Sequence, residues 1–121
     1  MSNPNITTIN KFFAAYGKHD LTAIREVMSD DVTWFFPGNH PLSGTKKGIE
    51  EVVAFFDLMA DGMKQSFARA EQLVVGGNDD YVVEAQHIRT TVDGITSEHH
   101  WCVLWKFENG KIIEGKHFVA E

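Results

Sequence analysis

The chain of 121 residues is 43% hydrophobic and 12% aromatic, which suits one domain (residues 1–121) with a packed core and argues against disorder. Its net charge of -6 and its scattered Lys and Arg residues argue against nucleic acid and anionic membrane surfaces as partners, because both select clustered basic side chains. With no signal-peptide pattern, no apolar run long enough to cross a membrane and a single cysteine, we expect a cytoplasmic protein without an intramolecular disulfide.

Helical periodicity opens the chain, with signals at both helix ends. Asn3 suits the N-cap, Pro4 the first helical position and Gly17 the end of the helix. The apolar residues between them fall on one stripe, formed by Ile6, Ile9, Phe12, Phe13 and Tyr16. A second, shorter helix is predicted after Asp20, another capping residue, with Leu21, Ile24, Val27 and Met28 at its apolar positions.

The apolar period changes in the segment 31–37, DVTWFFP, which is rich in strand-forming residues and ends at the turn signal Pro37-Gly38. We interpret the aromatic residues of this strand as one wall of a pocket, and the loop that follows, up to Gly48, as the pocket's rim. A third helix is predicted from Ile49 to near Gly62. Its apolar positions are Ile49, Val52, Val53, Phe56, Met59 and Met63.

Four strands are predicted in the rest of the chain, within residues 66–77, 80–92, 97–107 and 111–121. The dipeptides Asp93-Gly94 and Asn109-Gly110 are hairpin-turn signals between successive strands. This order of elements predicts an α+β fold, in which a curved, mostly antiparallel sheet is covered by helices on one face. A hollow between such a sheet and its helices is a usual place for a small-molecule site.

The order of elements resembles the nuclear transport factor 2-like superfamily, whose members form a cone-shaped α+β barrel. The segment 30–56, DDVTWFFPGNHPLSGTKKGIEEVVAFF, is similar to the SnoaL-like and ketosteroid-isomerase-like branch: a strand that starts with aspartate and carries Trp runs into Pro-Gly, and a Gly-x-x-x-Gly-type loop precedes a helix. The closing segment 108–118, ENGKIIEGKHF, resembles the final hairpin of that family. The resemblance implies three N-terminal helices packed on the concave face of the sheet.

The same resemblance implies cofactor-free chemistry by an isomerase, a cyclase or a hydratase/hydrolase, or ligand binding without turnover. The isomerase uses a carboxylate base, with a tyrosine and a protonated aspartate that stabilise the enolate. Tyr16 lies on the first helix, where that tyrosine is placed, but the first strand offers only Asp31 at its start, and Val103 stands where the aspartate is wanted. The steroid-isomerase constellation is therefore incomplete, and Glu84 is a further polar candidate.

Strand alternation assigns side chains to the two faces of the sheet. We place His99, Trp101, Val103, Trp105 and Phe107 on the concave face, because they are more aromatic than their neighbours His100, Cys102, Leu104 and Lys106. Trp34 and Phe36 share one face of the first strand. In the strands that carry His87 and His117, the pattern leaves open which face is inward.

Six histidines suggest acid-base chemistry near neutral pH. His40, held in a loop between prolines, His117 and His87 are the candidate catalytic residues, although each could equally be structural or solvated. The aromatic side chains expected to contact the ligand are Trp34, Phe36, Tyr16, Trp101 and Phe56.

The sequence predicts no metal and no cofactor, because no metal-ligand spacing is present. We expect the ligand to be a small hydrophobic, cyclic molecule. We also expect a homodimer that pairs through the convex face of the sheet, using residues such as Cys102 and Leu104.

Overall fold

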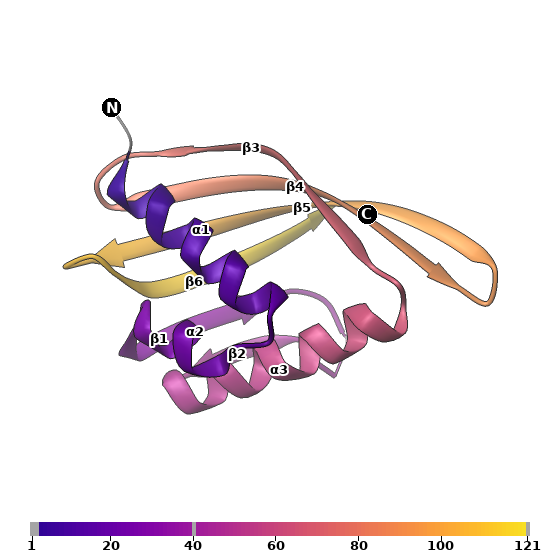
Figure 1. The fold of residues 1–121 in the computed structure, drawn as a ribbon, viewed down its shortest axis with the longest axis horizontal. Coiled ribbons are helices and arrows are strands. Elements are labelled where there is room, and N and C mark those ends of the chain that lie inside the picture. Colours follow the sequence, from indigo (N-terminus) through magenta and orange to yellow (C-terminus); the bar gives the residue numbers. More distant parts are fainter. Residues whose placement is uncertain (1–2, 40, 121) are drawn as a thin grey trace.

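The computed structural model describes residues 3–39 and 41–120 (Figure 1). The first half of the chain contains α1 (Pro4–Gly17), α2 (Leu21–Glu26), β1 (Met28–Phe36), β2 (Gly44–Lys47) and α3 (Ile49–Gln65). The second half contains β3 (Arg69–Gly77), β4 (Tyr81–Val92), β5 (Ile95–Glu108) and β6 (Lys111–Ala120). The predicted α+β fold, with three helices and then a meander of strands, is confirmed.

The helices begin where their capping residues predict. The Asn3 side chain accepts a hydrogen bond from the backbone N–H of Asn5, and the Asp20 side chain accepts one from that of Ala23. α3 continues past Gly62, where we predicted its end, to Gln65. A glycine inside a helix lowers its stability without breaking its hydrogen bonds, so Gly62 does not end this one. None of the helices in residues 3–39 and 41–120 is long and apolar enough to span a membrane.

The strands form one sheet in the order β2-β1-β6-β5-β4-β3. β1 and β6 are parallel and every other neighbouring pair is antiparallel. The predicted hairpin turns are present: the φ angles are 52° and 78° at Asp93 and Gly94, and 53° and 76° at Asn109 and Gly110. Positive φ at both central residues is the type I′ geometry that suits the twist of the flanking strands.

β2 corrects the prediction that residues 38–48 form only a loop. Gly44 pairs with Phe36, and Lys46 pairs with Trp34. β1 would otherwise be an edge strand with unpaired backbone groups, and the returning chain covers that edge. The aromatic strand β1 is therefore held on both sides, by β2 and by β6.

All three helices pack on the concave face of the curved sheet, and the β4–β5 hairpin extends beyond them (Figure 1). The core lies between the two layers and is built from Ile9, Phe12, Val52, Phe56, Trp34, Val103, Trp105 and other buried apolar residues. Trp101, Val103, Trp105 and Phe107 face inward as predicted, whereas His99 is exposed. His99 lies on the part of β5 that approaches the projecting hairpin, where helices no longer cover the sheet.

The structure shows which face of β4 and which face of β6 is inward, a point that the sequence left open. In β4 the buried set is Val82, Glu84, Gln86 and Ile88, so that His87 faces outward. In β6 both Ile112 and His117 are buried, although strict alternation would place them on opposite faces. A shift of register between Lys106 and Phe107 of β5 accommodates the extra residue of β6.

Candidate functional site

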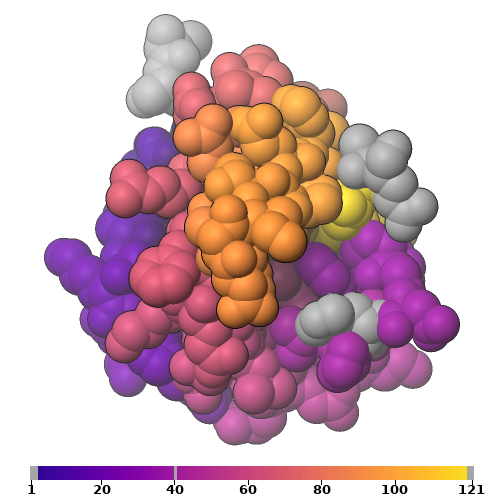
Figure 2. All heavy atoms as spheres, turned by 90° about the vertical axis from the view of Figure 1, so that its right-hand side faces the viewer, coloured from indigo at the N-terminus to yellow at the C-terminus, as the bar shows by residue number. Residues whose placement is uncertain are grey.

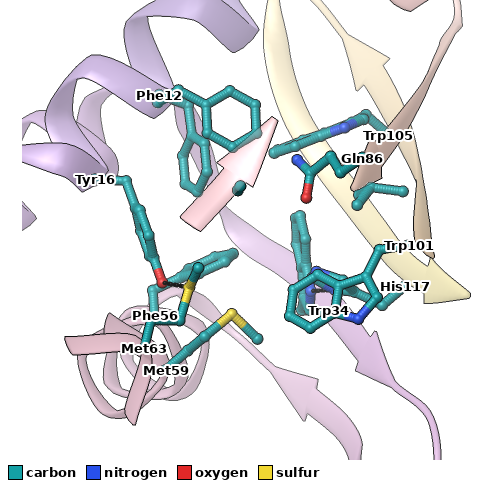
Figure 3. Close-up of a pocket in the computed structure, with 13 residues that line it drawn as sticks. Phe12, Tyr16, Trp34, Phe56, Met59, Met63, Gln86, Trp101, Trp105 and His117 are labelled. Carbon is teal, nitrogen blue, oxygen red and sulfur yellow. Dashed lines mark hydrogen bonds between the residues drawn. The ribbon is translucent and has the colours of Figure 1, made fainter. Parts of the chain in front are cut away.

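A cavity of about 90 Å³ lies between α1, α3 and the concave face of the sheet (Figure 3). The helices supply its aromatic and thioether side chains: Phe12, Phe13 and Tyr16 from α1, and Phe56, Met59 and Met63 from α3. The strands supply the rest of the wall: Trp34, Ala70, Gln86, Trp101, Val103, Trp105 and His117. The cavity is thus mainly apolar, and its polar groups are few and come from different strands and helices.

Four of the five predicted ligand contacts, Trp34, Tyr16, Trp101 and Phe56, line this cavity. Phe36 lies outside the lining and packs against His117, with their ring centroids 5.0 Å apart. Among the candidate catalytic residues, His117 is in the cavity wall. His40 lies outside the described residues.

The structure does not bring His87, the third candidate catalytic residue, into the cavity. Its side chain is on the opposite face of the sheet, and its Nε2 lies 3.1 Å from Oε1 of Glu98. The same carboxylate oxygen accepts a hydrogen bond from Arg89 at 3.2 Å. Because Gln86 takes the inward position of β4, the neighbouring His87 must point away from the cavity.

The indole of Trp34 fixes the protonation of His117. Nε1 of Trp34 donates a hydrogen bond to Nδ1 of His117 over 2.9 Å, and an indole nitrogen can only donate. Nδ1 therefore carries no proton, and the neutral imidazole of His117 carries its proton on Nε2. Among residues 3–39 and 41–120, no side chain or carbonyl accepts a hydrogen bond from that Nε2–H.

Burial keeps the imidazole of His117 uncharged. The residue is 4% exposed, and burial lowers its pKa from 6.5 to about 3. This differs from our expectation of a histidine that gains and loses protons near neutral pH. In the folded protein, His117 is a neutral hydrogen-bond donor.

Gly115 makes the approach of Trp34 to His117 possible. It is paired with Trp34 across the parallel β1–β6 ladder, and a Cβ at this position would lie 2.0 Å from a ring carbon of Trp34. Gly115 is not among the residues that the sequence predicts for the site. A glycine inside a strand pattern often marks the close approach of another group, and this signal was present in the segment EGKH.

Glu84 is a buried carboxyl group behind the cavity wall. It is 1% exposed, and burial raises its pKa. Nε2 of Gln72 donates to its Oε2 over 2.7 Å, while its Oε1 has no partner among the described residues. The donor groups of Gln86 and Trp105 lie beside the carboxyl group and oppose the rise of its pKa without completing a hydrogen bond to it.

Gln86 connects Glu84 to the cavity, because Glu84 attracts the amide N–H groups of Gln86. The amide oxygen of Gln86 then remains for the cavity, and Figure 3 shows it pointing toward Trp34 and His117. The polar groups of the cavity wall thus include the Nε2–H donor of His117 and the acceptor oxygen of Gln86. The indole N–H groups of Trp101 and Trp105 are further donors, and that of Trp105 has no partner among the described residues.

The hydroxyl of Tyr16 has a partner in the wall. It donates to Sδ of Met63 over 3.1 Å, and burial raises the pKa of the phenol, so that it stays protonated. Within residues 3–39 and 41–120, no group of three or more His, Cys, Asp or Glu side chains is arranged to hold a metal ion.

Among solved structures, the chain is similar to Bal32a from a soil-derived mobile gene cassette, with a TM-score of 0.85 and 24% identity, covering 98% of this chain and 90% of that chain. It is similar to TerC co-crystallized with polyporic acid, with a TM-score of 0.81 and 24% identity, covering 98% and 92%. A third similar structure is a putative SnoaL-like polyketide cyclase from Jannaschia sp. CCS1, with a TM-score of 0.77 and 19% identity, covering 96% and 85%.

Among curated proteins, an uncharacterized protein of Mycobacterium tuberculosis is 24% identical over 117 residues, which are 97% of this chain and 89% of that protein. An uncharacterized protein of Mycobacterium bovis matches with the same identity and coverage. The family model of the SnoaL-like domain matches residues 9–115. The chain therefore belongs to the SnoaL-like family and has the nuclear transport factor 2-like fold.

Proposed function

We propose that the cavity binds a small, flat, mainly apolar carbonyl compound and that the protein catalyses proton transfer beside this carbonyl group without a cofactor, with a water molecule taking the proton while the Nε2–H of His117 stabilises the enolate oxygen. Isomerisation, cyclisation and hydration are reactions of this kind. The observation that carries the proposal is the buried, neutral His117, whose Nε2–H has no acceptor among the described residues. A fixed donor in an apolar wall suits an oxygen on which negative charge develops.

A neutral imidazole is a suitable group for this role. It can donate a hydrogen bond to a carbonyl oxygen although it carries no charge, and other enzymes use a neutral histidine in this way. The hydrogen bond from Trp34 keeps Nδ1 occupied and holds the imidazole in one orientation. A donor held in advance costs no reorganisation during the reaction, and removing one such donor typically lowers the rate by about 10²–10³-fold.

The size and lining of the cavity define the ligand further. A volume of about 90 Å³ is smaller than the roughly 150 Å³ of an apolar cavity that binds benzene, so the ligand part held there is at most a single small ring. Met59 and Met63 can adapt to a larger one, because the thioether side chain is flexible. Co-crystallization of the similar protein TerC with polyporic acid supports the use of this fold for small molecules.

A second candidate function is ligand binding without turnover. It is favoured by one observation: among residues 3–39 and 41–120, no Asp or Glu lines the cavity as a base. Glu84 is buried behind Gln86 rather than in the wall. The two candidates share the same site and differ in whether a proton leaves the bound ligand.

Deuterium uptake separates the two candidates. Small cyclic ketones and enones are incubated with the protein in D₂O, and NMR follows exchange at the carbon beside the carbonyl group. We expect exchange with the native protein and a rate lower by about 10²-fold with His117→Leu. His100→Leu, an exposed position of β5, is the matched control and should exchange at the native rate.

Three outcomes of this experiment are informative. Binding without exchange supports the second candidate, and exchange that is unchanged in His117→Leu contradicts the assigned role of His117. Absence of both binding and exchange across the compounds contradicts the ligand site itself. Gln86→Leu provides a second variant with an altered cavity wall if His117→Leu does not fold.

We also propose that two copies pair through the convex face of the sheet. Phe35, Val83 and Phe118 are exposed there, beside the exposed Cys102 and close to Leu104. The strand register aligns Val83 with Leu104 and aligns Cys102 with Phe118, so that apolar side chains of neighbouring strands lie next to one another. Sedimentation should give the mass of a dimer for the native protein and that of a monomer for Val83→Glu/Phe118→Glu; a monomeric native protein would contradict the pairing.

A further inference from the structure

Glu84 is surrounded by hydrogen-bond donors from three strands. Nε2 of Gln72 in β3 donates to its Oε2 over 2.7 Å. The amide N–H groups of Gln86 in β4 and the indole N–H of Trp105 in β5 lie beside the same carboxyl group. Among residues 3–39 and 41–120, Glu84 has no ion-pair partner. The carboxyl group is therefore an acceptor for amide and indole donors.

Glu84 and Gln86 lie together beneath the surface. They are two residues apart on the inward face of β4, so their side chains point to the same side of the sheet. At the end of the molecule that faces the viewer in Figure 2, the β4–β5 hairpin (orange) and the segment after α3 form the surface. Glu84 is 1% exposed and Gln86 is 7% exposed. Solvent therefore hardly competes with the carboxyl group for the N–H groups of Gln86.

The carboxyl group determines which end of the Gln86 amide enters the cavity. A side-chain amide has donors on its nitrogen and an acceptor on its oxygen. If the amide turned round, its oxygen would face the oxygens of Glu84 and the buried N–H groups would lose their acceptor, which is unfavourable. Figure 3 shows the oxygen of Gln86 pointing toward Trp34 and His117. No group of the described residues donates a hydrogen bond to that oxygen.

The oxygen of Gln86 and the Nε2–H of His117 approach the cavity from two strands that β5 separates. On β5, Gln86 is paired with Trp101 and His117 with Val103, two residues further along. Neighbouring strands are about 5 Å apart, so the two backbones are about 10 Å apart. Both side chains point to the concave side, so that their polar groups lie closer together than that. A hydroxyl group and a carbonyl oxygen on adjacent ring carbons suit such an acceptor and donor.

We propose that the ligand is a cyclic hydroxy-carbonyl compound, whose carbonyl oxygen accepts from His117 and whose adjacent hydroxyl group donates to Gln86. Glu84 is the positioning residue that selects the hydroxyl group, because it keeps the oxygen of Gln86 toward the cavity. The proposal rests on the proposed function for the carbonyl group and adds the second functional group of the ligand. An enolised 1,2-diketone in a five-membered ring carries both groups on a single small ring, as a cavity of about 90 Å³ requires.

Two matched probes test for the hydroxyl group: 2-hydroxycyclopent-2-enone and 2-methylcyclopent-2-enone. They share the ring and the carbonyl group, and a methyl group has nearly the size of a hydroxyl group but cannot donate a hydrogen bond. All three tryptophans of the chain line the cavity, so their fluorescence reports binding. We expect the native protein to bind the hydroxy probe about 10-fold more tightly than the methyl probe. Equal affinities would overturn the proposal.

Variants of the cavity wall locate the hydroxyl group. Gln86→Met removes the acceptor and keeps the length of the side chain, so it should bind the two probes with nearly equal affinity. His117→Leu removes the donor to the carbonyl group that both probes share, so it should weaken both and keep the preference. Gln86→Leu serves as a second variant if Gln86→Met does not fold. A preference for the hydroxy probe that survives without the amide contradicts the assigned role of Gln86.

Variants of Glu84 separate positioning from a structural role. In Glu84→Leu the amide of Gln86 loses its acceptor and can turn round, so the affinities for the two probes should become nearly equal. Glu84→Gln keeps an oxygen that can accept from Gln86 and should restore most of the preference. Val82→Ala, a buried position on the same face of β4, lowers stability and should keep the native ratio of affinities. A native ratio in Glu84→Leu would overturn the role of Glu84.

The same probes distinguish a failure of this inference from a failure of the proposed function. If both probes bind, and cyclic ketones exchange deuterium, but the hydroxyl group brings no preference, the hydroxy-carbonyl ligand is wrong while the proposed function stands. If neither probe binds and no ketone exchanges, both are wrong.

Discussion

The two faces of the sheet carry the same residue types, histidine and glutamate, in opposite environments. On the concave face, His117 and Glu84 are almost fully buried, and their partners are the side chains of Trp34 and Gln72. On the convex face, His87 lies against the exposed carboxylate of Glu98. A step of one residue along a strand is enough to change an imidazole from a solvated partner of a carboxylate into a buried neutral donor.

The chemistry of the cavity depends on burial more than on residue type. The imidazole of His117 is neutral because burial lowers its pKa to about 3, whereas burial raises the pKa of Glu84. Both shifts favour the uncharged forms. The concave face therefore supplies a polar but largely uncharged set of groups, which suits recognition of a neutral ligand.

The largest expected difference between the two faces concerns adjacent residues of β1. Trp34 is 1% exposed and Phe35 is 37% exposed. Trp34→Ala should lower the free energy of unfolding by about 3–5 kcal/mol, the usual cost of deleting a buried aromatic side chain. Phe35→Ala should cost less than about 1 kcal/mol. Urea denaturation measures both, and similar losses would contradict the assignment of faces.

The next effect is the pH dependence that the buried His117 confers. Its pKa is lowered from 6.5 to about 3 on folding, so the unfolded chain binds this proton first as the pH falls. The stabilisation is complete above the unfolded pKa and is lost as the pH falls toward the folded one. Between about pH 7.5 and about pH 4.5, the native protein should lose about 2–3 kcal/mol through this group alone.

Variants isolate that contribution in urea titrations at a series of pH values. His117→Gln should flatten the loss of stability below neutral pH, whereas His100→Gln on the exposed part of β5 should keep it.

The effect of pH on stability has the opposite sign for Glu84. Its raised pKa gives stability that is present below its unfolded pKa and is lost as the pH rises through its folded pKa. Glu84→Gln should therefore raise the urea midpoint at neutral pH. Identical pH profiles of stability in all of these variants would contradict the pKa shifts of both His117 and Glu84.

The close approach of Gly115 and Trp34 gives the third effect. Gly115→Ala places a methyl group where the indole lies and should cost about 1–3 kcal/mol, as overpacking does. In a Trp34→Phe background the smaller ring leaves room, so that the added cost of Gly115→Ala should fall. A double-mutant cycle in urea measures this coupling. Additive losses would show that Gly115 acts independently of the indole.

The sequence predicts best what is decided locally. The caps Asn3 and Asp20 and the turns Asp93-Gly94 and Asn109-Gly110 are confirmed, because each depends on a few neighbouring residues. β2 was not predicted, since its pairing depends on where β1 leaves an open edge. The fold followed from the order of the elements together with the family resemblance.

The site was only partly predictable, because its geometry depends on contacts between distant strands. The inward position of His117 follows from a register shift between β5 and β6, which a strict period of two does not contain. Its role as a donor follows from the hydrogen bond with Trp34, a residue far away in the chain. His87 looked equivalent in the sequence, and only the choice of Gln86 as the inward residue of β4 separates the two.

The smallest expected effect lies on the convex face. Glu98 accepts from Arg89 and lies beside His87, and these charges lower its pKa, with the Arg89 hydrogen bond as the main cause. Exposed ion pairs of this kind contribute little, since water and salt screen them. Glu98→Gln should therefore shift the urea midpoint less than Gly115→Ala does, and high salt should shrink the shift further. A large shift that high salt does not reduce would mean that the convex face is covered in solution, as pairing of two copies would require.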